Sequence, residues 1–258
     1  MRDLLGVGVL VTRPESQAAE LTRLLTGSGA EVFHLPTLQT RACAALPSLR
    51  ASLGPLDRYR FIVFMSANAV RHGAMLLEGL AGLPLAAVGP ATAAALAAAG
   101  HAVTLMPERG FTSEHLLECA PMQAIAGARI LIVRGAGGRD VLGDTLVARG
   151  AQVTYADVYE RACAVPLPGA IDAVERAWKS GHIHIVTATS GEVLRCLIEL
   201  LTAEGRSLAH RARLLVGGQR IAGEARRMGF EGELILADSP DSPALVRALR
   251  QWRSGMPR

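Results

Sequence analysis

The sequence has few aromatic residues and almost no lysine. Aromatics make up 4% of the 258 residues, while 50% are hydrophobic, so the core must consist mostly of Ala, Val, Leu and Ile. Aliphatic runs of this kind are typical of strands buried on both faces, as in parallel α/β sheets. Lys179 is the only lysine, and the net charge is +4. With no lysine-rich run, we expect no nucleic-acid partner. The arginines suit carboxylates and phosphates, which a guanidinium binds through two hydrogen bonds.

The cysteines form no CxxC pair and no dense framework. The four positions are Cys43, Cys119, Cys163 and Cys196, and their spacing predicts reduced thiols in a cytoplasmic protein. The first strand is expected within a few residues of Met1, which leaves no room for a signal peptide. Residues 80–106 lack Asp, Glu, Lys and Arg, but glycines and prolines interrupt them. We therefore expect no membrane span.

Several common catalytic motifs are missing. Gly135-x-Gly137 lacks the third glycine of GxGxxG, and no GxxxxGK[ST], HExxH or GxSxG is present. His182 and His184 are better explained as core or surface histidines than as metal ligands. Nucleotide, metal and hydrolytic chemistry are therefore poorly supported, and we expect no metal site.

The predicted fold is α/β, with strands and helices alternating along the whole chain. Two stretches, residues 30–43 and 151–163, follow glycine-ended helices and exceed the usual strand length of about five or six residues. We interpret both as overlong strands that cross between two domains and pair antiparallel. The remaining strands are expected at residues 7–11, 61–65, 85–88, 103–106, 129–133, 184–187, 214–216 and 234–236.

These elements predict two similar flavodoxin-like domains, each with a parallel five-stranded sheet. Domain 1 is discontinuous, comprising residues 1–36 and 168–258, and domain 2 is inserted as residues 44–155. Residues 37–43 and 156–167 form a two-stranded antiparallel linker. An internal repeat supports a duplication: residues 62–70 parallel 185–193, residues 87–89 parallel 215–217, and the helix start at 113–117 parallels 242–246.

Small, hydroxyl-bearing or glycine-rich turns follow the predicted strands. Ligands bind beyond the carboxyl ends of parallel strands, where free N–H groups of helix N-termini attract anions. Any one such turn is explained by helix capping, whereas six turns facing a cleft favour a site for several anionic groups. The turns are residues 12–13, 66–68, 89–92, 134–138, 189–191 and 217–220.

The order and spacing of these turns resemble the uroporphyrinogen-III synthase family over essentially the whole chain. The matching segments are VTRP at 11–14, FMSANAV at 64–70, AVGPATAAAL at 87–96, LIVRGAGGRD at 131–140, VYE at 158–160 and VGG at 216–218. The resemblance implies a two-domain lyase of tetrapyrrole (haem, sirohaem or cobalamin) biosynthesis that uses no metal or cofactor. Its substrate would be hydroxymethylbilane, a linear tetrapyrrole with eight carboxylates, closed with loss of water and inversion of ring D.

The resemblance also suggests site residues. Tyr159 matches the family tyrosine proposed to assist loss of the hydroxyl, although an aromatic side chain there also suits cross-strand packing. Arg220 stands where the family commonly has Thr, which leaves its role open. Arg13 and Arg134 lie at matching strand ends, where each could instead pair with a carboxylate. The expected substrate-binding residues are Arg13, Ser66, Ala67, Asn68, Thr92, Arg134, Ser190, Gly191, Gly218 and Arg220.

Two other classes of protein share parts of this pattern. A non-catalytic two-domain protein that binds small anions would have the same domains and crossings, but we find no export signal or DNA-binding segment. A nucleotide-dependent α/β enzyme would contain glycine motifs that this sequence lacks. For the synthase we expect a cytoplasmic monomer that receives hydroxymethylbilane from hydroxymethylbilane synthase.

Overall fold

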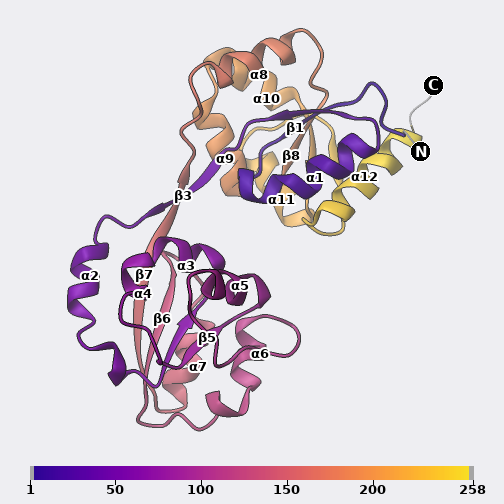
Figure 1. Cartoon of the computed structure of the whole chain (residues 1–258). Helices are drawn as coiled ribbons and strands as arrows, with labels where there is room; N and C mark the ends of the chain where they lie inside the picture. Colours follow the sequence, from indigo (N-terminus) through magenta and orange to yellow (C-terminus); the bar gives the residue numbers. More distant parts are fainter. Residues whose placement is uncertain (1–2, 256–258) are drawn as a thin grey trace. The chain divides into compact units, whose positions relative to one another are not determined.

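The computed structural model describes residues 3–255 as two compact units, each built on a five-stranded sheet (Figure 1). Unit 1 contains the described residues up to Gln39 and those from Ala162 onward, and unit 2 is the continuous segment Thr40–Arg161. None of the helices in the described residues combines the length and apolar character needed to cross a membrane.

The sheet of unit 1 has the order β10-β9-β8-β1-β2, and its strands are parallel. Its strands are β1 (Gly8–Val11), β2 (Glu31–His34), β8 (Ile185–Ala188), β9 (Arg213–Val216) and β10 (Leu234–Leu236). Its helices are α1 (Glu15–Gly27), α8 (Ala170–Lys179), α9 (Gly191–Leu200), α10 (Ala203–Arg211), α11 (Gln219–Arg227) and α12 (Ser242–Ser254).

Helices cover both faces of this sheet, because successive side chains of a strand point to opposite faces. Leu10 and Val186 pack with residues of α8, α9, α10 and α11. Val9 and Ile185, their chain neighbours, pack with residues of α1 and α12. The continuous aliphatic runs of the sequence thus fill two core layers at once.

The sheet of unit 2 has the order β3-β7-β6-β4-β5. Its strands are β3 (Leu38–Ala42), β4 (Phe61–Phe64), β5 (Leu85–Ala87), β6 (Arg129–Gly135) and β7 (Gln152–Cys163). Its helices are α2 (Leu46–Ser52), α3 (Ala67–His72), α4 (Ala74–Leu77), α5 (Pro90–Ala98), α6 (Ser113–Glu118) and α7 (Val141–Ala148), with 3-10 turns η1 (Leu56–Arg58) and η2 (Ala120–Met122). Helices α2 to α5 contribute to one core layer, and α6, η2 and α7 to the other.

Strand β7 has 12 residues, which confirms the predicted overlong strand. Its partner β3 runs antiparallel to it, because Cys43 N donates to Val158 O while Ala164 N donates to Thr37 O. The prediction of one continuous strand over residues 30–43 is wrong. Strands β2 and β3 belong to different sheets, and Pro36 between them has no N–H to donate to a ladder.

The prediction of a strand at residues 103–106 is also wrong. Only Leu105 pairs, through an isolated parallel bridge to Ala86. Thr104 N and Leu105 N both donate to the carbonyl of Leu85, which bends the segment away from a regular ladder, and Pro107 directly follows. The fifth strand of this sheet is therefore the antiparallel β3, in place of the expected parallel strand.

The two sheets share one spatial order when the internal repeat sets the correspondence. The repeat equates β4 with β8 and β5 with β9, and the Leu105 segment and β10 each precede the third pair of repeated stretches, at residues 113–117 and 242–246. On that basis the order β10-β9-β8-β1-β2 corresponds to Leu105-β5-β4-β6-β7. The units are thus alike in space but begin at different points of the shared pattern.

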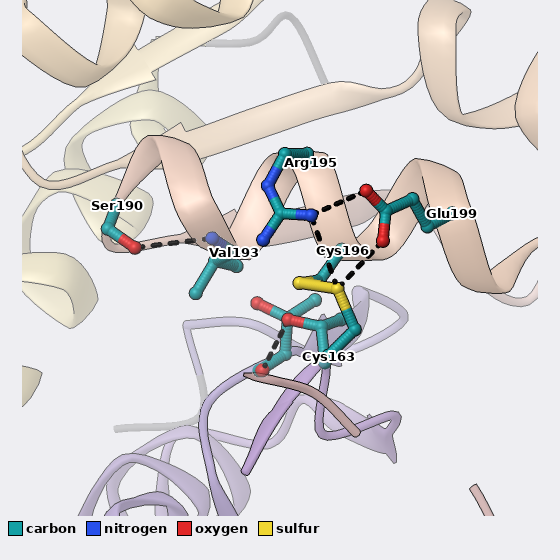
Figure 2. Close-up of a disulfide and its surroundings, with 8 residues drawn as sticks. Cys163, Ser190, Val193, Arg195, Cys196 and Glu199 are labelled. Atoms are coloured by element: carbon teal, nitrogen blue, oxygen red, sulfur yellow. Dashed lines mark hydrogen bonds and ion pairs between the residues drawn. A yellow bond between two sulfur atoms is a disulfide. The ribbon is translucent and has the colours of Figure 1, made fainter. Parts of the chain in front are cut away.

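The expectation of four reduced cysteines is wrong for one pair. Cys163, the last residue of β7, forms a disulfide with Cys196 of α9 across 33 residues of sequence (Figure 2). Sequence spacing does not reveal such a pair, because the fold brings the two positions together. Cys43 and Cys119 are free thiols, and burial raises the pKa of both.

Candidate functional site

Tyr159 is held in a fixed position within unit 2. A register shift between Arg134 and Gly135 of β6 places Tyr159 directly opposite Gly135. A Cβ atom on Gly135 would lie 2.5 Å from Cζ of the tyrosine ring, so only glycine leaves room for the ring. On α3, His72 stacks on the same ring at 5.5 Å between centroids. Tyr159 is 7% exposed and belongs to the core of unit 2.

The hydroxyl of Tyr159 lies 3.2 Å from the hydroxyl of Ser66. Ser66 follows β4 and caps α3, where its Oγ accepts a hydrogen bond from Ala69 N at 3.1 Å. Ser66 is partly exposed, in contrast to the buried tyrosine. The structure therefore brings together two of the residues that the resemblance suggested, and the serine is the more accessible of them.

His72 joins this group from its other side. Its Nε2 lies 2.8 Å from the hydroxyl of Thr40 on β3. Burial, with a smaller contribution from the charge of Arg71, lowers the pKa of His72 below its ordinary value. A neutral imidazole therefore lies against the ring of Tyr159 at pH 7. Neither His72 nor Thr40 was expected from the sequence, since no motif marks them.

Arg134 is held by partners within unit 2. Its Nε donates to Asp157 at 3.0 Å and its Nη1 to Asp140 at 2.6 Å. Its guanidinium also lies 3.9 Å from the centroid of the Tyr155 ring. Burial opposes the charge of Arg134, but the hydrogen bonds to the two carboxylates outweigh it and raise its pKa.

Arg13 is similarly engaged within unit 1. It is buried, and it donates to Ser242 Oγ at 3.0 Å and to the carbonyl of Pro240. Burial lowers the pKa of its guanidinium. These contacts connect the end of β1 to the start of α12, which is the structural role left open for this residue.

The remaining candidates of unit 2 lie at helix starts. Ala67 is the first residue of α3, and Asn68 accepts a hydrogen bond from Arg71. Thr92 lies in the first turn of α5, where its N–H donates to the carbonyl of Gly89 and its side chain is buried.

In unit 1, the candidate turns after β8 and β9 are linked by Glu224. Ser190 caps α9 by accepting from Val193 N at 3.2 Å. A Cβ atom on Gly191 would collide with the carboxylate of Glu224, and that carboxylate also accepts from Arg220 at 2.5 Å. Gly218, which caps α11, has φ +127°, a conformation that favours glycine.

A pocket of about 470 Å³ lies beside these turns. Its lining combines two cations with two carboxylates, and Glu224, which the sequence did not single out, is among them. The lining residues are Gly191, Glu192, Arg195, Glu224, Arg227 and Met228.

One group of residues in the described part of the chain has the composition of a metal site. Atoms of Cys163, Cys196 and Glu199 that could ligate a metal lie within 4.8 Å of one another. The disulfide occupies both sulfurs, so neither is a thiolate ligand while it is intact.

Comparisons with protein families and with curated proteins indicate one and the same family over nearly the whole chain. The family model described as uroporphyrinogen-III synthase HemD matches residues 19–247. Uroporphyrinogen-III synthase of Escherichia coli K12 is 37% identical over 251 residues, covering 95% of this chain and 100% of the relative. The Salmonella typhimurium enzyme is 35% identical with the same coverage.

Solved structures show the same fold at low sequence identity. A mutant uroporphyrinogen III synthase from Thermus thermophilus aligns with a TM-score of 0.53 and 19% identity, covering 96% of this chain and 98% of the other. Uroporphyrinogen-III synthetase of Helicobacter pylori 26695 aligns with a TM-score of 0.57 and 17% identity, covering 95% and 99%.

Proposed function

Because this chain belongs to the uroporphyrinogen-III synthase family, we propose that it cyclises hydroxymethylbilane with Tyr159 and Ser66 at the reacting centre. The activity is that of a lyase of tetrapyrrole biosynthesis: the linear substrate loses water and closes to uroporphyrinogen III. The match to the family model over residues 19–247 carries this conclusion. The alternative of a non-catalytic anion-binding protein is not favoured, since full-length curated relatives are synthases.

The proposed chemistry needs little acid–base assistance. A pyrrole nitrogen can donate electrons to expel the hydroxyl of the substrate, so the protein has mainly to fix one conformation and exclude water. A phenol at a defined position can assist by donating to the departing oxygen. The stacking of His72 on the Tyr159 ring and the contact of the Tyr159 hydroxyl with Ser66 support this role.

The eight carboxylates of the substrate call for several hydrogen-bond donors. We assign this role to turns at the helix starts of each unit, where free N–H groups attract anions. The assigned residues are Ala67, Asn68, Thr92, Ser190, Gly191, Gly218 and Arg220, whereas Ser66 is assigned to the reacting centre. The side chain of Arg220 pairs with Glu224 but is 72% exposed, which leaves it open to a carboxylate. For Arg13 and Arg134, their existing partners favour a structural role.

We also propose the finer domain assignment: two flavodoxin-like domains, residues 1–36 with 168–258 and residues 44–155, joined by an antiparallel linker of residues 37–43 and 156–167. The shared spatial order of the two sheets and the β3–β7 pairing support it. Residues 1–2 and 256–258 lie outside the described part of the chain. Unit 1 has the strand order 2-1-3-4-5 of flavodoxin-like sheets when its strands are numbered along the chain.

The test of function is an isomer assay. The protein is incubated with freshly generated hydroxymethylbilane, and the oxidised products are resolved as isomers I and III. We expect isomer III, whereas isomer I alone, the product of spontaneous closure, would contradict the proposed activity. Size measurement in solution tests the predicted monomer, and channelling assays with hydroxymethylbilane synthase test the predicted hand-over.

A cytoplasmic location also stays a prediction. The Cys163–Cys196 disulfide bears on it, because disulfides are rare in a compartment whose thiols are kept reduced. Alkylation of thiols in freshly lysed cells, followed by mass measurement of the intact protein, shows whether the pair is oxidised there.

A further inference from the structure

The positions of Ser66 and Tyr159 differ in a way that bears on which group reaches the substrate. Tyr159 is almost fully buried, with His72 stacked on its ring and Gly135 directly opposite. Its hydroxyl therefore cannot swing outward without moving these neighbours. Ser66, 3.2 Å away, is partly exposed at the carboxyl end of β4, which is the end of a parallel sheet where ligands bind.

The hydrogen bonds of Ser66 allow the phenol of Tyr159 to donate to its hydroxyl. Its Oγ already accepts from Ala69 N, and a hydroxyl oxygen can accept a second hydrogen bond while donating one. If the phenol of Tyr159 donates to Oγ, the hydroxyl hydrogen of Ser66 is free to point outward. The opposite direction would use the serine hydrogen on a buried oxygen.

From this geometry we propose that Ser66 is the residue that donates to the departing hydroxyl of hydroxymethylbilane, and that Tyr159 supplies the proton through Ser66. This inference rests on the proposed function and refines it. Ser66 is then the catalytic residue in contact with the substrate. Tyr159 acts through it, and His72 and Gly135 hold the phenol in place.

The proton balance closes over one turnover. The C–O bond of the substrate breaks with its electron pair going to oxygen, which takes the Ser66 proton and leaves as water. Ser66 takes the proton of Tyr159, leaving a phenolate, while a pyrrole nitrogen stabilises the carbon cation. The carbon cation bonds to the ring D carbon that already carries the bridge to ring C, and that bridge bond then breaks. The freed bridge carbon bonds to the other α-carbon of ring D, which loses its proton, and this proton returns through Ser66 to Tyr159.

Proton transfer from Tyr159 through Ser66 to the substrate, here called the relay, predicts that Ser66→Ala and Tyr159→Phe lower kcat equally. It also predicts that the two losses do not add in the double variant. Each single variant should lower kcat for isomer III by about 100-fold, at the low end of the range for general acid catalysis. KM should stay within about twofold, because the lost interaction belongs to the transition state. The double variant should be no slower than either single variant. Ser66→Thr, which keeps the hydroxyl and the cap, should retain activity.

Loss of the helix cap needs its own control. Thr112 caps α6 of the same unit by accepting from His115 N at 3.4 Å, and it lies outside the proposed site. Thr112→Ala should therefore lose a cap of the same kind and keep the kcat of the parent protein. Circular dichroism of every variant confirms that the fold is retained.

Each outcome of this experiment supports or overturns the relay. Equal, non-additive losses support it. A Ser66→Ala variant with unchanged kcat beside an impaired Tyr159→Phe would show that tyrosine acts directly, and multiplicative losses would show two independent roles. Unchanged turnover in Tyr159→Phe would remove the proton source. If the parent protein forms isomer I alone, the proposed function itself fails, which is a separate result from these.

Discussion

Arg13 and Arg134 were both expected to bind substrate, but the structure shows that each is engaged by partners in its own unit. Arg13 follows β1 and Arg134 lies at the end of β6, where a ligand-binding arginine would be expected. Both instead donate to groups of their own unit: Arg13 to Ser242 and the carbonyl of Pro240, and Arg134 to two carboxylates. The sequence shows the position of an arginine at a strand end, but not the distant partners that occupy its guanidinium.

Replacement of Arg134 should therefore affect stability. Its side chain is 12% exposed, and Arg134→Met leaves Asp140 and Asp157 without their shared cation. We expect a loss of about 2 kcal/mol in the free energy of unfolding of unit 2, typical of hydrogen bonds to charged groups. Urea denaturation followed by circular dichroism measures it.

Arg139→Met is the matched control for this change. Arg139 is 74% exposed and lies 3.6 Å from Glu114, an exposed ion pair that solvent screens and that contributes little to stability. If both variants lose the same free energy of unfolding, the hydrogen bonds of Arg134 to Asp140 and Asp157 stabilise unit 2 no more than an exposed ion pair does.

His72 should make the stability of unit 2 depend on pH. Its folded pKa is lowered from the ordinary 6.5 by burial and then by Arg71. Between that lowered pKa and 6.5 the unfolded chain binds more protons than the folded one, so stability rises with pH through this window and falls as the solution is acidified.

His72→Gln keeps a hydrogen-bonding group near Thr40 but removes the titration. Urea midpoints measured between pH 7.5 and pH 5 should fall less steeply for this variant than for the parent protein. Equal slopes would mean that other groups account for the acid sensitivity. His101→Gln, at a histidine in the segment between α5 and α6, serves as the control.

At the scale of elements, the disulfide fastens the end of β7 to α9. The loop it closes spans 33 residues. In the chain-entropy description, a loop of this length stabilises the folded state by about 3–4 kcal/mol relative to the reduced protein. The exposed Arg195–Glu199 ion pair beside it contributes little by comparison (Figure 2).

Reduction or Cys163→Ser should therefore lower the stability of unit 1 by about 3–4 kcal/mol. Trp178 and Trp252 both lie in unit 1, so tryptophan fluorescence during urea denaturation follows this unit. Cys43→Ser provides the control, since Cys43 is a free thiol at the end of the other crossing strand. A Cys163→Ser variant as stable as Cys43→Ser would show that the bond does not form or does not stabilise.

At the scale of the whole molecule, strand periodicity and the internal repeat predicted most of the architecture. The internal repeat predicted the two domains because each of them is built from the same strand–turn–helix segments, which leave local patterns in the sequence. Residues 30–43 and 103–106 were misjudged because pairing partners, which are not local, decide whether an extended segment joins a sheet. Likewise, Ser66 and Tyr159 could be proposed from the resemblance, but His72, Thr40 and Gly135 could not, since only the fold brings them to the tyrosine ring.

The discontinuity of unit 1 has a consequence for synthesis on the ribosome. Strand β1 pairs with β8, and Thr12 donates hydrogen bonds through its N–H and its hydroxyl to Thr187, 175 residues later. Unit 2 is complete in the nascent chain before β8 exists. At about 5–20 residues per second, β1, α1 and β2 wait roughly eight to thirty seconds with an unpaired, aliphatic edge. This segment is synthesised before unit 2 but can complete its sheet only after it, so its aliphatic edge stays open throughout that interval.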